Sequence, residues 1–152
     1  ANAWYYQGSI YEEAKDYERA VDCMLHAAAF ENSRFAESAL DHAASISWQQ
    51  VDYENAMDLY MRLYAKTTDA ERQKRSLYCI VSSAGRIEEH EAVIMYADKA
   101  LQTQLSQEQR TEVMYFKAKA LLSQNQGKDA RPILEELSKD TRSQYGAEWM
   151  PW

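Results

Sequence analysis

The chain has 152 residues, of which 46% are hydrophobic and 27% charged, a composition that excludes disorder and fits one soluble globular domain with a sizeable core. Its formal net charge of −7 argues against nucleic-acid binding, and no apolar run approaches the roughly 18 residues of a membrane span. Only 4 glycines and 2 prolines are present, so a fold of many short strands, which needs frequent tight turns, is disfavoured and long helices are expected.

Apolar residues recur at helical spacing along almost the whole chain, and breaks in the pattern predict eight helices. Two breaks carry capping-box sequences, residues 68–71 and 106–109, which predict helix starts with Thr68 and Ser106 as N-caps. The breaks fall near residues 15–16, 32–33, 50–52, 67–69, 85–86, 103–106, 124–127 and 140–143.

The few glycines and prolines also have expected places. Gly8 is expected at a close contact between helices, whereas Gly85 and Gly127 are expected at turns. Pro132 is expected in the opening turn of a helix, where its missing amide costs little. Gly146 is expected at the junction to a further unit.

An internal repeat organises these helices. Residues 16–20 and 52–56 are similar and lie 36 positions apart, and matching apolar positions extend the register at intervals of 36, 37 and 37 residues. Twelve residues before each of these positions stands a residue with a small or medium-sized side chain. This constant spacing predicts helical hairpins in which the two helix axes approach most closely at the same pair of positions. A hairpin cannot bury both of its faces, so four hairpins are expected to stack as a solenoid. The paired positions are Gly8 and Ala20, Ala44 and Ala56, Val81 and Val93, and Ala118 and Ala130.

The same register predicts further core positions in both helices of each hairpin. One set stands four residues before the small residue of the first helix, namely Trp4, Leu40, Leu77 and Met114. The other set closes the second helix, namely Ala27, Leu63, Ala100 and Leu137.

The first hairpin resembles the tetratricopeptide repeat (TPR) family. Residues 4–11 read Trp-Tyr-Tyr-Gln-Gly-Ser-Ile-Tyr and are followed by Ala20 and Ala27, similar to the TPR series of Trp, Leu, Gly, Tyr and two alanines. Gln7 replaces the leucine, Asn32 replaces the terminal proline, and the period exceeds the usual length of about 34 residues. The resemblance implies a right-handed α-α superhelix in a single domain, 1–152, with repeats over 1–32, 33–68, 69–105 and 106–142 and a truncated fifth at 143–152.

The resemblance also implies where a ligand would bind. First helices line the concave groove of TPR-like arrays, and the position after the Trp-like residue and the position one turn later face that groove. Rings flanked by hydroxyls suit a peptide, although the same tyrosines could instead complete the packing between successive first helices. The expected groove residues are Tyr5, Ser9, Asp41, Ser45, Tyr78, Ser82, Tyr115 and Lys119.

Catalytic, metal and cofactor sites are not expected. His26 lies three residues after Cys23 without a second ligand pair, and His90 lies among acids at a helix start. His42 follows an aspartate, and neighbouring residues on a helix point apart. Cys23 and Cys79 are expected as small buried hydrophobes.

These features favour a non-enzymatic scaffold that binds a peptide or protein segment, with no nucleic-acid partner. The family resemblance is to tandem TPR proteins of bacterial cell envelopes, which favours the periplasm or outer membrane, with the cytoplasm as the other option. The alternative function is a sensory or regulatory segment of a larger signalling or transcription-control protein, and a third is an enzyme using His42 or His90. Self-association through the C-terminal repeat face, near Trp149 and Trp152, is a further expectation.

Overall fold

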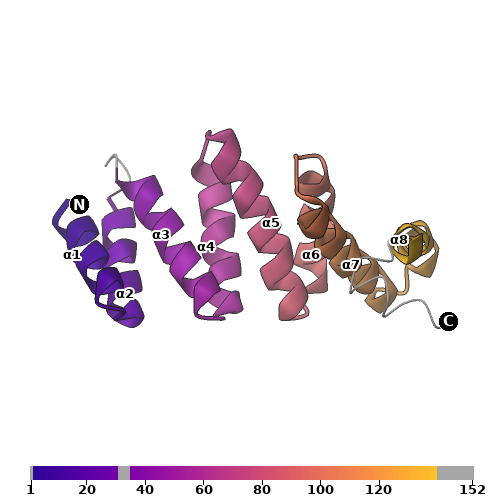
Figure 1. Cartoon of the computed structure of the whole chain (residues 1–152), viewed down its shortest axis with the longest axis horizontal. Helices are drawn as coiled ribbons and strands as arrows, with labels where there is room; N and C mark the ends of the chain where they lie inside the picture. The colour runs from indigo at the N-terminus through magenta and orange to yellow at the C-terminus, as the bar shows by residue number, and fades with distance from the viewer. Residues whose placement is uncertain (1, 31–34, 140–152) are drawn as a thin grey trace. The chain divides into compact units, whose positions relative to one another are not determined.

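The computed structural model describes residues 2–30 and 35–139, and the regular secondary structure within these ranges is entirely helical. The predicted all-α fold with eight helices is thereby confirmed for this part of the chain. Figure 1 labels the helices, and α1 packs against α2, α3 against α4, and α7 against α8. The helices are α1 (Asn2–Glu13), α2 (Tyr17–Ala28), α3 (Ala36–Gln49), α4 (Tyr53–Lys66), α5 (Ala70–Arg86), α6 (His90–Leu101), α7 (Gln107–Ser123) and α8 (Gly127–Lys139).

The chain forms two compact units, Ala1–Ser76 and Leu77–Trp152, with the boundary inside α5. In the first unit α2 also packs on α3, and in the second α6 packs on α7. Each unit therefore contains a contact between the second helix of one hairpin and the first helix of the next. The single domain and the right-handed superhelix stay predictions.

All four hairpin turns have the same backbone design. Each turn has three residues, and its middle residue has a positive φ, at 64° in Lys15, 63° in Val51, 60° in Glu88 and 60° in Asn125. In the first turn Lys15 N donates to Glu12 O and Asp16 N donates to Tyr11 O, which is a Schellman motif, and the other three turns repeat this pair of bonds. A turn of fixed length and geometry explains why the twelve-residue spacing never varies.

The last residue of each turn also begins the next helix. Asp16 and Asp52 accept side-chain hydrogen bonds from the amides of Arg19 and Asn55, so each is an N-cap as well as the end of the preceding motif. Because one residue ends the first helix and caps the second, the two helices follow each other without a flexible link.

Val51 is the least suitable side chain among the four left-handed positions, because a β-branched residue is strained at positive φ. Its side chain is 66% exposed and contributes little packing. We expect Val51→Gly to raise the free energy of unfolding by about 1 kcal/mol, measured from urea unfolding curves. Asn125→Gly is the matched control with a smaller expected gain, because asparagine tolerates this conformation. A Val51→Gly protein no more stable than the parent would contradict the prediction.

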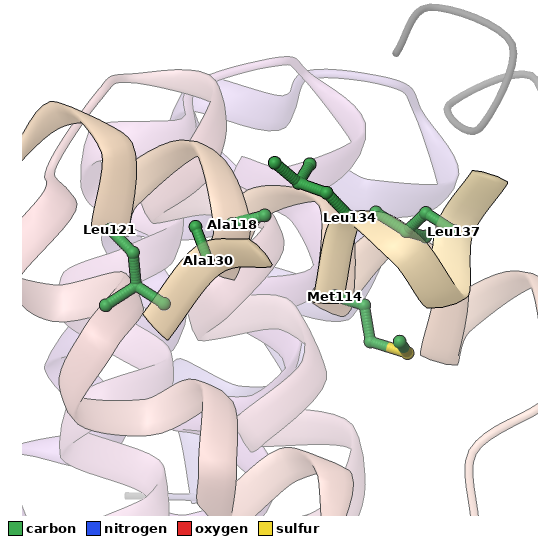
Figure 2. Close-up of a cluster of buried hydrophobic side chains, with 6 residues drawn as sticks. All are labelled: Met114, Ala118, Leu121, Ala130, Leu134 and Leu137. Carbon is green, nitrogen blue, oxygen red and sulfur yellow. The ribbon is translucent and has the colours of Figure 1, made fainter. Parts of the chain in front are cut away.

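The repeat register is confirmed as the buried core. All eight positions predicted at the closest approaches are buried, as are the four that close the second helices. Both cysteines are buried free thiols, as predicted. Figure 2 shows one part of this core, in which side chains of α7 meet side chains of α8. This cluster consists of Met114, Ala118, Leu121, Ala130, Leu134 and Leu137.

Gly8 lies at a close helix contact, as predicted. A Cβ atom on Gly8 would lie 3.0 Å from Met24 Cε and 3.2 Å from Cys23 Cβ, both on α2. Gly85 differs from its prediction, because it lies inside α5, beneath the ring of Phe116, rather than in the following turn. It allows two helices to approach and is not needed for a turn conformation.

Four other expectations need correction. Trp4 is 37% exposed, because it stacks on the exposed ring of His26, with centroids 4.4 Å apart, instead of entering the core. Asp69, and not Thr68, caps α5, since its carboxylate accepts from the amides at positions 71 and 72. Pro132 lies inside α8 and not in its opening turn, and Gly127 is the first residue of α8.

The other start signal is confirmed, because Ser106 and Gln109 form a complete capping box. The expectations for Asn32, Gly146 and residues 143–152, including the C-terminal self-association face, lie outside the described residues.

Candidate functional site

The eight predicted groove residues lie at equivalent points of the four first helices. All of them are half-buried except Ser82, which is fully buried. α1 and α3 belong to the first unit, whereas the residues on α5 and α7 belong to the second. Each unit therefore has its own candidate surface.

In the first unit, Tyr5 of α1 contacts α3. Its hydroxyl lies 3.3 Å from His42 Nε2, and its ring lies 4.9 Å from the ring of Phe35. Glu12 Oε2 lies 3.6 Å from Nδ1 of the same histidine. The acid that faces His42 thus comes from α1 and not from the neighbouring aspartate. Ser9 donates its hydroxyl to the carbonyl of Tyr5, within its own helix.

Asp41 occupies the tyrosine position of α3 and pairs with arginines of α5. Its Oδ2 atom forms ion pairs with Arg75 Nη2 and, at 3.4 Å, with Arg72 Nε. Arg72 also pairs with Glu37 at 3.3 Å and donates to Ser38 Oγ at 3.1 Å. The guanidinium groups hold the first turns of α5 against α3.

A buried carboxylate is the centre of the corresponding contact in the second unit. Glu112 of α7 is only 7% exposed. Its Oε1 atom accepts from Ser82 Oγ at 2.8 Å and from Arg86 Nη2 at 2.9 Å, and its Oε2 atom accepts from the hydroxyl of Tyr78. We call these four residues the Glu112 cluster, and it joins α5 to α7.

Burial raises the pKa of Tyr78 well above its usual value of about 10, and the hydrogen bond to Glu112 and the charge of Glu112 raise it further. The folded protein therefore keeps a proton that the unfolded chain releases. This contribution to stability is complete below about pH 10 and is lost as the pH rises above that value.

The last two predicted residues lie on α7. Tyr115 packs against the buried cluster of Figure 2, and its ring lies 5.3 Å from that of Phe116. Lys119, one turn further along α7, is half-buried. The surface at Tyr115 and Lys119 therefore combines an aromatic ring with a cation.

Sequence reasoning did not single out Glu112, Arg72 or Arg86. A signal was present for part of this network, because three of the contacts between first helices join residues 34 positions apart, namely Ser38–Arg72, Asp41–Arg75 and Tyr78–Glu112. Complementary polar pairs at this offset, slightly shorter than the repeat, could have been found by a search. The contacts agree with the alternative in which these positions pack first helices together, and peptide binding stays a prediction.

The other two histidines considered as candidate ligands or catalysts, His26 and His90, lie outside the contacts between first helices described above. His26 stacks on Trp4, and His90 is the first residue of α6. Among the described residues no three His, Cys, Asp or Glu side chains gather as a metal site would require. The described helices also include none long and apolar enough to cross a membrane.

Comparison with known proteins adds no identification: no protein-family model matches the chain, and no curated protein matches it.

Proposed function

We propose that the chain is a non-enzymatic scaffold of the TPR type, which binds an extended segment of another protein on the faces of its first helices. The observation that supports this proposal is the strict repetition of one hairpin design, because it brings equivalent half-buried side chains to equivalent points of successive first helices. Within each unit, the side chains of two first helices would contact an extended peptide at two successive points.

The chemistry of the two surfaces indicates how contact would be made. The hydroxyls of Tyr5 and Tyr78 already bond within the protein, so their rings, rather than their hydroxyls, would contact a ligand. In the first unit Tyr5 and Phe35 form an aromatic patch, and the half-buried Ser45 lies further along α3. In the second unit Lys119 adds a positive charge beside Tyr115, which favours a segment with acidic and apolar residues.

Site-specific photo-crosslinking tests this proposal. A photoreactive phenylalanine at position 45 and one at position 119 should crosslink the same partner in cells. The matched controls are positions 58 and 95, which are exposed on the second helices α4 and α6 and should not crosslink that partner. Each variant must keep the helical circular dichroism of the parent.

Equal crosslinking from the first-helix and second-helix positions, or none from positions 45 and 119, would remove the assignment to the first-helix faces.

A further inference from the structure

The two halves of α5 are attached to different parts of the chain. Arg75, in the first half, pairs with Asp41 of α3, and both residues belong to the first unit. The Glu112 cluster joins the second half of α5 to α7, within the second unit. The boundary between the units falls between Ser76 and Leu77, so each half of α5 is bonded to a helix of its own unit.

Two buried hydroxyls lie on either side of this boundary. Ser76 and Ser83 stand seven residues apart, which is about two helical turns, so they share one side of α5. Both residues are fully buried, and within the described part of the chain neither hydroxyl has a hydrogen-bond partner. A buried polar group without a partner has lost its hydration and gained no bond, so it weakens the packing around it.

The equivalent positions on α3 and α7 are apolar. Ala39 and Ile46 stand thirty-seven residues earlier, Val113 and Ala120 stand thirty-seven residues later, and all four are at most 1% exposed. Buried apolar side chains stabilise a helix through the area that they remove from water and through dispersion contacts, which a hydroxyl does not replace. This side of α5 therefore stabilises the chain less than the same side of α3 or α7.

We propose that α5 is a weak joint, that is, a helix whose middle opens before the neighbouring helices α3 and α7 unfold. The amides of residues 77–80 donate to the carbonyls of residues 73–76, so these helical hydrogen bonds cross the unit boundary. They must break whenever one unit unfolds without the other. A partner bound to one unit would then stabilise that unit and not the other. The joint does not depend on peptide binding by the first-helix faces.

Native-state amide hydrogen exchange of the full chain tests the joint. After correction for intrinsic rates, the amides of residues 77–80 are expected to exchange about tenfold or more faster than the equivalent amides on α3 and α7. The equivalent amides are those of residues 40–43 and 114–117, which lie inside their helices at the same register positions.

Removing the two hydroxyls should strengthen the joint. The double variant Ser76→Ala with Ser83→Ala is expected to slow the exchange of residues 77–80 by about tenfold, because it removes both unpaired polar groups. Alanine is also the better helix former, so a second double variant, Ser76→Cys with Ser83→Cys under reducing conditions, excludes that cause. Cysteine has a helix propensity similar to that of serine and packs as a small hydrophobe, so exchange should still slow by about threefold or more.

Ser82→Ala is the matched control, since Ser82 is the neighbouring buried serine and donates to Glu112 Oε1 at 2.8 Å. This substitution should speed the exchange of residues 77–80, because it removes a bonded hydroxyl. Equal protection of residues 77–80 and their equivalents in the parent, or no slowing in either double variant, would overturn the proposal. Faster exchange in both double variants would also overturn it, because it would show that the two hydroxyls are bonded.

Discussion

Gly85→Ala is expected to lower the free energy of unfolding by roughly 2 kcal/mol, although alanine is the better helix former. A Cβ atom at this position would lie 2.8 Å from Phe116 Cε1 and closer still to Cγ and Cδ1 of the ring. The ring is buried and joined to α7 at its near edge, so it cannot swing aside as the end of a flexible chain would. Chemical unfolding monitored by circular dichroism measures the loss.

Two further variants separate this clash from a general effect of alanine. Gly127→Ala is the control, because a Cβ atom there would meet only Leu122, at 4.0 Å, and it should be neutral or slightly stabilising. Adding Phe116→Leu should recover part of the stability that Gly85→Ala loses, since the smaller side chain leaves room for the methyl group. Additive losses in the double variant would show that the ring is not the cause.

Glu112→Leu should cost roughly 2–3 kcal/mol of stability. The substitution removes the acceptor of Ser82, which is fully buried, and the partner of Arg86. The loss is smaller than for a fully buried ion pair, because the side chain of Arg86 is 37% exposed and water can solvate it. The matched control is Glu108→Gln on the exposed first turn of the same helix, with an expected change below about 0.5 kcal/mol.

Tyr78 provides an independent readout of the same cluster. Glu112→Gln removes the negative charge beside the phenol, so the pKa of Tyr78 should fall towards its usual range. Alkaline titration of tyrosinate absorbance, with Tyr78→Phe to assign the signal, measures this shift. An unchanged titration in Glu112→Gln would show that the carboxylate does not act on Tyr78.

Much of the helical framework could be predicted from the sequence, because close helix packing requires small residues at fixed places. Gly8, Ala44 and Ala118 are buried at the positions predicted for the closest approaches, and their spacing to the partner helix predicted the hairpins. The helical spacing of apolar residues depends only on residues near one another in the chain, so it can be recognised in a single sequence.

The side-chain pairs of the candidate site were not predictable in the same way. Glu112 reads as one acid among many in a chain of charge −7, and only the packing of α5 against α7 buries it beside Tyr78. Gly85 was misplaced for a related reason, since glycine serves both turns and close contacts and the ring that decides between them lies 31 positions away. Non-local contacts of this kind depend on how neighbouring helices meet, which periodicity does not determine.

The shared three-residue turn also determines where the chain can change length. One inserted residue would rotate the following helix by about 100° about its axis and move its apolar side away from the partner helix. Residues 87–89 and 124–126 must therefore keep their length, whereas the links between hairpins already differ, with three residues at 67–69 and five at 102–106. Insertions, affinity tags and natural length variation should accordingly be tolerated between hairpins and rejected within them.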